Sequence, residues 1–475
     1  MIFHSLDFVL FFLVVTAIYW TLPRRGQNVL LLVASYFFYG YVHPWFLTLI
    51  AATTVVDYLA ARGMDAWPDR RRLMLGLSLA VNLGLLGFFK YFNFFAENVH
   101  GALALVGLDV SMPALRVILP VGISFYTFQE LSYTIEVYRG TMKARRDFLD
   151  FATFVCFFPQ LVAGPIERAS HLLPQVEQPR RWSWDASRDA AGLILWGYFK
   201  KLVIADNVGV VANKVFALQT PGFWVLWAGV FAFAIQIYAD FSAYSDIARG
   251  TAKWLGFDLM RNFNQPYAAT GPGDFWRRWH ISLSSWFRDY VFIPLGGSRG
   301  SQARTMANLM ATFLVSGLWH GASWNYVIWG AYHGTLVVLG RIAGSPRGPR
   351  SLGGPRGATR VLRVVATFAL TLVGWLIFRE TDIQMLLHDF TLAPWRTTAA
   401  DVRIGAYLFL TVAVFTLPLA VDSALAMWRD MRGEPSPADP SRPRWLWRAA
   451  LAGAGFAIIL VFRSRQSLDF IYFQF

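Results

Sequence analysis

The chain has 475 residues, of which 56% are hydrophobic, 17% aromatic and 15% charged. Soluble domains carry roughly a quarter of charged residues, so this chain has too little charge to cover a water-facing surface of its size. The composition predicts a polytopic membrane protein and excludes a disordered, collagen-like or repeat protein.

The charge balance is strongly positive, with 43 Lys and Arg against 29 Asp and Glu, a formal net charge of +14. In a membrane protein, basic residues gather in short cytoplasmic loops, so we expect a lipid membrane and not nucleic acid as the partner. Basic clusters after the first and third apolar stretches share one side, which predicts an extracytoplasmic N-terminus. Cys156 is the one cysteine and permits no internal disulfide.

Taken in chain order, the apolar stretches predict an all-α bundle with about 11–13 membrane segments, some of them re-entrant. We expect one integral membrane domain over residues 1–475, with no separate soluble domain and no cleaved signal peptide. Two stretches rich in Gly, Pro and Arg, at 344–357 and 433–444, are interpreted as flexible cytoplasmic loops. The expected segments are 6–22, 28–42, 44–61, 73–95, 117–137, 148–166, 190–211, 223–239, 306–319, 324–339, 361–378, 404–419 and 449–462.

Residues 120–138 carry an unusual number of polar side chains for a membrane segment, among them Gln129 and Glu130. These positions do not share one helical face, so two structures fit: a broken segment that lines a polar cavity, or a helix packed wholly inside the bundle. Ionisable residues at membrane depth are costly and often functional, which makes Gln129 and Glu130 candidate tunnel-lining residues.

Two further polar regions interrupt apolar stretches. Residues 157–168 contain two prolines and a glycine, which predicts that no regular helix continues through them. Residues 236–246 contain Tyr238 and Asp240, which either line a substrate tunnel or mark a helix end at the membrane interface.

Residues 274–290 are the richest region. Trp279, Leu283 and Trp286 repeat at helical spacing, which predicts one amphipathic helix at the cytoplasmic interface. A glycine-rich basic loop follows at 294–300 and leads into an apolar helix. That helix reaches His320 after a rise of roughly 22 Å, so the sequence predicts an imidazole well inside the membrane.

Histidine takes and returns a proton near neutral pH, so His320 is a candidate general base, although a buried structural histidine is the alternative. The spacing of the histidines matches no zinc motif, and no Gly-x-Ser-x-Gly elbow occurs, so a metalloenzyme and a serine hydrolase are both disfavoured.

Residues 274–297 and the motif Leu318-Trp319-His320-Gly321 closely resemble the membrane-bound O-acyltransferase (MBOAT) family, and within it the bacterial branch that acetylates alginate. Segments 120–138, 159–167, 238–246 and 470–475 resemble this branch as well. The resemblance implies a helical bundle pierced by a tunnel, with His320 matching the catalytic histidine and His280 the second family histidine.

The resemblance also implies the chemistry. An acyl thioester, acetyl-CoA, is offered from the cytoplasm, and no tightly bound cofactor is expected. A polysaccharide hydroxyl receives the acetyl group outside the bacterial inner membrane, through a periplasmic accepting protein. His280, with Arg278 or Asp289 nearby in sequence, is a candidate for donor positioning or oxyanion support, and Trp319 for tunnel lining.

Several alternatives stay open. The acceptor is alginate, cellulose or peptidoglycan, and a related branch transfers D-alanine to teichoic acid. A polymer or acyl-carrier transporter would also use broken helices and buried carboxylates, but the paired repeats common in transporters are not seen. A membrane scaffold for a secretion complex is the non-catalytic alternative.

Overall fold

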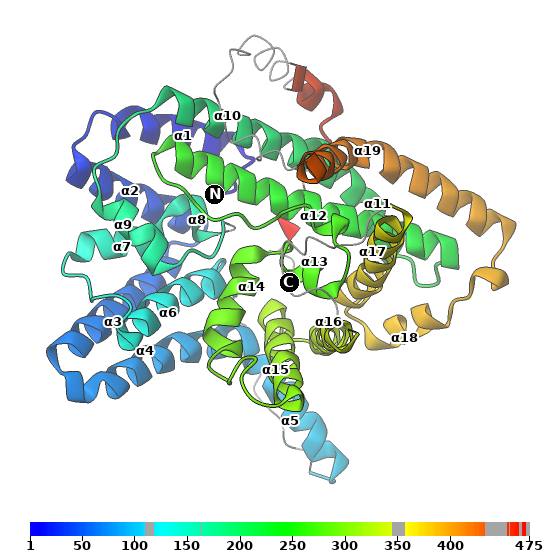
Figure 1. Ribbon diagram of the computed structural model, residues 1–475, viewed down its shortest axis with the longest axis horizontal. Coiled ribbons are helices and arrows are strands. Elements are labelled where there is room, and N and C mark those ends of the chain that lie inside the picture. Colours follow the sequence, from blue (N-terminus) through cyan, green and yellow to red (C-terminus); the bar gives the residue numbers. More distant parts are fainter. Residues whose placement is uncertain are drawn as a thin grey trace. The chain divides into compact units, whose positions relative to one another are not determined.

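The computed structural model describes residues 1–108, 110, 118–162, 164–343, 357–432, 454–455, 457–464 and 468–471. Within these ranges all regular structure is helical, which confirms the all-α prediction (Figure 1). The predicted loop at 433–444, nearly all of that at 344–357, the start of the 449–462 segment and residues 472–475 lie outside the described residues.

Five helical segments of the described chain are long and apolar enough to cross a membrane. Within Phe223–Trp254 an apolar stretch of 18 residues is 89% buried inside the protein, whereas the corresponding stretches of Pro68–Leu105 and Ala399–Leu425 are each only 17% buried. Apolar side chains left exposed over such lengths need lipid around them, so the latter two face the membrane. The five segments are Phe46–Ala66, Pro68–Leu105, Phe223–Trp254, Ala358–Arg379 and Ala399–Leu425.

The chain packs into two compact units. Unit 1 comprises Met1–Ile194 and Ile247–Met260, and unit 2 comprises Leu195–Asp246 and Arg261–Phe475. Two helices run from one unit into the other, namely α10 (Trp184–Phe199) and α12 (Phe223–Trp254). The remaining helices of unit 1 are α1 (Leu6–Tyr19), α2 (Arg24–Gly40), α3 (Phe46–Ala66), η1 (Pro68–Arg70), α4 (Arg71–Leu86), η2 (Gly87–Tyr91), α5 (Phe92–Leu105), α6 (Ile123–Arg139), α7 (Phe148–Cys156), α8 (Phe158–Leu161) and α9 (Ala169–Glu177).

Unit 2 contains the two histidines that the sequence singles out. Its helices are η3 (Lys200–Ala205), α11 (Asp206–Phe216), η4 (Pro266–Ala268), α13 (Pro272–Trp276), α14 (Ile281–Phe287), η5 (Arg288–Phe292), α15 (Gln302–His320), α16 (Trp324–Ile342), α17 (Ala358–Arg379), α18 (Ile383–Thr391), η6 (Pro394–Arg396) and α19 (Ala399–Arg432).

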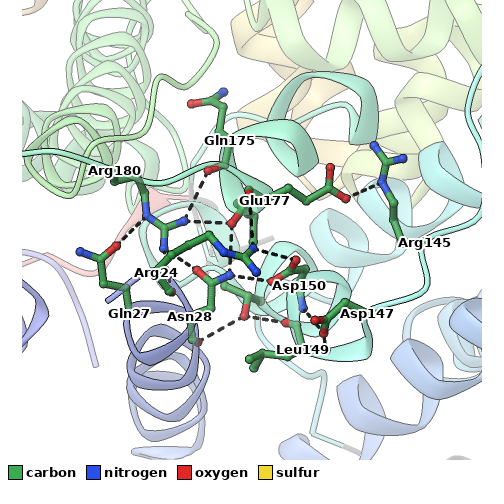
Figure 2. A network of polar contacts seen from close by, with 12 residues as sticks. Arg24, Gln27, Asn28, Arg145, Asp147, Leu149, Asp150, Gln175, Glu177 and Arg180 are labelled. Carbon is green, nitrogen blue, oxygen red and sulfur yellow. Dashed lines mark hydrogen bonds and ion pairs between the residues drawn. The ribbon is translucent and has the colours of Figure 1, made fainter. Parts of the chain in front are cut away.

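A polar network ties three helices of unit 1 together (Figure 2). Asp150 of α7 accepts hydrogen bonds from Arg24 (3.0 Å) and Asn28 (2.7 Å) of α2. Arg180 donates to Asn28 and to backbone carbonyls in the last turn of α9. The final carbonyls of a helix have no partner within it, so these side chains satisfy groups that α9 leaves open and fix its end against α2.

Segment 120–138 forms the regular helix α6, which lies between Gly122 (φ 78°) and Gly140 (φ 74°). The broken-segment alternative is therefore wrong, and the buried-helix alternative is confirmed. The physical reason is that its polar side chains find partners inside the bundle. Gln129 donates to the carbonyl of Phe154 (2.6 Å), and Ser78 donates to Thr134 (3.1 Å).

The predicted interruption at 157–168 is confirmed. Helix α7 ends at Cys156, the short α8 begins at Phe158 with Pro159 in its first turn, and residues 165–168 are not helical before α9 begins at Ala169.

Two local predictions are wrong. Residues 236–246 are not a helix end, because α12 continues to Trp254, and its carboxylates at Asp240 and Asp246 pair with lysines inside unit 2. Residues 274–290 are not one amphipathic helix, because the chain turns at His280 (φ 43°) between α13 and α14. The predicted apolar residues Trp279, Leu283 and Trp286 are instead buried within the protein.

Candidate active site

His280 occupies a strained turn that points its side chain inward. Its backbone is left-handed (φ 43°, ψ 56°), a conformation that costs a non-glycine residue roughly 1–2 kcal/mol. Asn262 holds this turn: its carbonyl accepts from Ile281 N (2.9 Å), and its amide side chain accepts from Ser282 (2.6 Å) and donates to Ser245 of α12 (2.9 Å). These bonds compensate the strain and leave His280 0% exposed.

His320 is the last residue of α15, as its predicted distance from the basic loop requires. Helix α16 packs closely against α15 because two glycines face the crossing. A Cβ on Gly317 would lie 2.2 Å from the carbonyl oxygen of Tyr326, and one on Gly330 would lie 2.4 Å from that of Phe313. Only glycine permits such backbone contact, so this pair sets where His320 lies.

The imidazole of His320 is enclosed by aromatic rings and is 5% exposed. Its ring centroid lies 5.0 Å from Trp319, 4.9 Å from Trp329 of α16 and 5.3 Å from Phe378 of α17. Apolar walls of this kind lower the local dielectric and strengthen each electrostatic interaction made inside them.

Trp319 brings the two histidines into one site. Its indole contacts His320 and also His280, with ring centroids 5.0 Å and 6.1 Å apart respectively. The histidines are 40 residues apart in sequence, and their contact with one side chain is the central geometric feature of unit 2.

The protonation of His280 follows from its burial. His280 lies outside the five membrane-crossing helices, and burial lowers its pKa to about 3. Its imidazole is therefore neutral at physiological pH and offers one N–H donor and one acceptor nitrogen.

Tyr238 and Asp240 lie on α12 within unit 2, but they make different contacts. Tyr238 packs on Tyr267 (5.3 Å) and on Trp279 (6.3 Å), the residue before His280. Asp240 forms an ion pair with Lys201 (3.0 Å).

The other predicted site residues make local contacts. Arg278 pairs with Asp274 (3.0 Å), and Asp289 pairs with its neighbour Arg288 (2.7 Å). Gln129 and Glu130 belong to α6 in unit 1, where Glu130 accepts a hydrogen bond from Thr54 (3.2 Å). Their roles as substrate-binding or tunnel-lining residues stay predictions.

Sequence reasoning missed three residues of this site. Trp329 and Phe378 form walls around His320, and Asn262 holds the turn at His280. Trp329 follows His320 on the next helix, and this closeness in sequence was a usable signal. Asn262 has no local signal, because its partners Ser245 and Ser282 are distant in the chain.

His333 of α16 lies behind Trp329, with ring centroids 4.9 Å apart, and also contacts Trp276 (5.1 Å). A Cβ on Gly374 would lie 2.4 Å from its Nε2, so α17 packs directly over this imidazole. His333 is thus part of the packed core that supports the wall of the site.

Comparison with known proteins places this sequence in a family. Residues 143–345 match the model of the MBOAT, membrane-bound O-acyltransferase, family, and this range contains both His280 and His320. A probable alginate O-acetylase, AlgI, from Pseudomonas aeruginosa is 36% identical over 100% of both chains.

Two relatives with other names are also similar. The peptidoglycan O-acetyltransferase of Helicobacter pylori is 34% identical over 78% of this chain and 75% of its own. The teichoic acid D-alanyltransferase of Bacillus subtilis is 28% identical over 54% of this chain and 68% of its own. With its helical membrane fold and paired histidines, the chain belongs to the membrane-bound O-acyltransferase family and is an acyltransferase.

Proposed function

We propose that this protein transfers an acetyl group from acetyl-CoA on the cytoplasmic side of the bacterial inner membrane towards a hydroxyl of alginate outside it. Similarity to the Pseudomonas aeruginosa alginate O-acetylase along both whole chains supports this acceptor. The observation that carries the proposal is that His280 and His320 contact the same indole of Trp319 within a buried aromatic enclosure.

His320 acts as the general base. A thioester is already activated, whereas a hydroxyl at neutral pH is a poor nucleophile, so a positioned imidazole contributes roughly 10²–10⁴-fold. The acceptor oxygen attacks the thioester carbonyl as its proton passes to His320. The tetrahedral intermediate then expels the thiolate of CoA, which takes the same proton back from the imidazolium.

His280 supports this reaction as a neutral hydrogen-bonding group. Because its pKa lies far below neutrality, it brings no fixed positive charge, and its ring N–H is suited to orient the donor or to stabilise the oxyanion. The fixed turn at His280 keeps that ring preorganised.

The donor and the acceptor arrive from opposite sides. Two basic residues, Arg299 in the glycine-rich loop and Arg304 in the first turn of α15, are suited to attract the phosphates of CoA in the cytoplasm. On the other side, a periplasmic protein receives the acetyl group and passes it to the polysaccharide. The N-terminus is then periplasmic, in agreement with the positive-inside pattern.

The test is complementation of a strain that lacks the gene. His320→Gln is expected to insert at the wild-type amount and to leave the secreted alginate without O-acetyl groups, as measured by NMR of the purified polymer. Gly84→Ala in α4, where the added Cβ would meet no atom within 4 Å, serves as the matched control and should insert normally and keep full O-acetylation.

If the His320→Gln strain still secretes acetylated alginate, His320 is not the general base. If the wild-type gene instead restores acetyl groups on peptidoglycan, or D-alanine on teichoic acid, then alginate is not the acceptor. The proposed role of His320 would be unaffected by that result. If vesicles that contain the protein take up an unchanged solute and release no free CoA thiol, the protein is a transporter and not an acetyltransferase.

A further inference from the structure

A buried charge cluster lies in unit 2 beside the histidine site. Lys201, at 1% exposure, contacts Asp206 (2.9 Å) and Asp240 (3.0 Å), which are each 2% exposed. The π-helical turn η3 directs both Lys200 and Lys201 into the protein. Burying three charges carries a large desolvation penalty, which is offset only when each charge has partners in good geometry.

The chain segment 468–471 supplies two of those partners. Lys201 donates to the carbonyl of Leu468 (2.8 Å), and the backbone N–H of Ile471 donates to the second carboxylate oxygen of Asp240 (2.7 Å). Since backbone groups make both bonds, they fix where this segment lies whatever its side chains are.

The segment places one aromatic ring behind the histidine site. Phe470 is 0% exposed and stacks on Tyr244 of α12, with ring centroids 4.1 Å apart. It also contacts Phe241 (5.8 Å), and Phe241 meets the ring of His280 edge-on (4.6 Å). His280 thus has Phe241 and Trp319 as neighbouring rings, and Phe470 is the next ring beyond Phe241.

We propose that segment 468–471 is a positioning element for His280, with Phe470 as its positioning residue and the Lys201–Asp240 pair as its anchor. This inference rests on the proposed function, because it takes His280 to be part of the acetyl-transfer site. The segment lies well beyond residues 143–345, which the family model matches.

The packing explains how Phe470 acts through its neighbour. Without the Phe470 ring, a cavity forms behind Phe241, and side chains around a cavity relax into it only partly. Phe241 then no longer holds the edge of the imidazole. Displacement of a reacting or supporting group by about 1 Å costs up to ~10²-fold in rate. The proposed contacts of Arg299 and Arg304 with the phosphates of CoA are untouched, so the affinity for acetyl-CoA should change little.

The experiment compares Phe470→Ala with Phe470→Leu and with Phe38→Ala in the full-length purified protein. Phe38 is also buried, but it lies in α2 of unit 1 among other phenylalanines. Two quantities are measured per amount of folded protein: the kcat and KM of acetyl transfer from acetyl-CoA, and the modification of His280 by diethylpyrocarbonate, mapped by mass spectrometry.

In Phe470→Ala we expect kcat to fall by about 10²-fold with KM for acetyl-CoA changed by less than about twofold. We also expect His280, inert in the wild type because it is buried, to become reactive. Phe470→Leu should restore most of the kcat and the protection, because it refills most of the volume. Phe38→Ala should lower the yield of folded protein and leave both quantities unchanged.

An unchanged kcat together with unreactive His280 in Phe470→Ala would overturn the inference, as would an equal fall in Phe38→Ala. Modification of His280 does not depend on turnover, so this readout separates the two claims. If the proposed function fails, no variant has acetyl transfer to lose, but exposure of His280 in Phe470→Ala alone still supports segment 468–471 as its positioning element.

Discussion

The crossing of α15 and α16 makes the sharpest prediction about the position of His320. In Gly317→Ala, the added Cβ would lie 2.2 Å from the carbonyl oxygen of Tyr326, whereas an ordinary contact begins at 3.4 Å. The obstacle is backbone and cannot swing aside, so the two helices must separate by about 1 Å. Overpacking of this kind costs ~1–3 kcal/mol.

The same displacement moves the ring of His320, the proposed base, because His320 lies one turn beyond Gly317 on the same helix. We therefore expect Gly317→Ala to lower the free energy of unfolding by about 2 kcal/mol and kcat by ~10²-fold. Thermal unfolding in detergent and CoA-thiol release per folded protein measure the two effects separately.

Gly84→Ala provides the matched control. Gly84 lies within α4, and a Cβ there would meet no atom within 4 Å. Alanine is the better helix residue, so this variant should be more stable by about 0.5–1 kcal/mol and should keep its turnover. Wild-type stability and wild-type turnover in Gly317→Ala would refute the close-packing argument.

Three further predictions follow from the same residues. Asn262→Ala removes two side-chain hydrogen bonds at the His280 turn and should cost about 2 kcal/mol in thermal unfolding; an unchanged melting temperature would contradict its role in holding that turn. His280→Val should be less stable than His280→Asn by roughly 1–2 kcal/mol, because asparagine accepts the left-handed backbone and a β-branched residue does not; equal melting temperatures would argue against strain at this position. The hydrogen bond to Glu167 raises the pKa of His171 above its ordinary 6.5, and burial raises the pKa of Glu167 above 4.5. The folded protein therefore holds these protons more tightly than the unfolded chain, and its stability should fall as the pH rises above 4.5 and again above 6.5. His171→Gln should remove the part of this decline above pH 6.5 in a melting series, and an unaltered slope there would exclude His171 as its source.

The sequence was sufficient for the features that depend on local pattern. Apolar length predicted the helical membrane fold, paired prolines predicted the break after Cys156, and the apolar stretch after the basic loop predicted the helix that ends at His320. Each of these depends on residues close together in the chain, where periodicity and backbone chemistry act directly.

Features that depend on distant partners were missed. The 236–246 region was not recognised as helix interior, because the lysines that neutralise its carboxylates lie about 40 residues away. The apolar spacing of residues 274–290 predicted one helix, but the chain turns at His280. Asn262 stabilises the left-handed backbone there, a conformation that histidine rarely adopts. Tertiary hydrogen bonds and ion pairs of this kind override local propensity, and no single segment reveals them.

The most direct measurement is acetyl transfer by the purified protein in liposomes, with radiolabelled acetyl-CoA supplied on one face and the acceptor on the other. The wild type should release one free CoA thiol for each acetyl group that reaches the acceptor, and His320→Gln should lose this transfer by about 10²–10⁴-fold while still binding the donor. Equal transfer by the two proteins would contradict the assignment of His320 as the base.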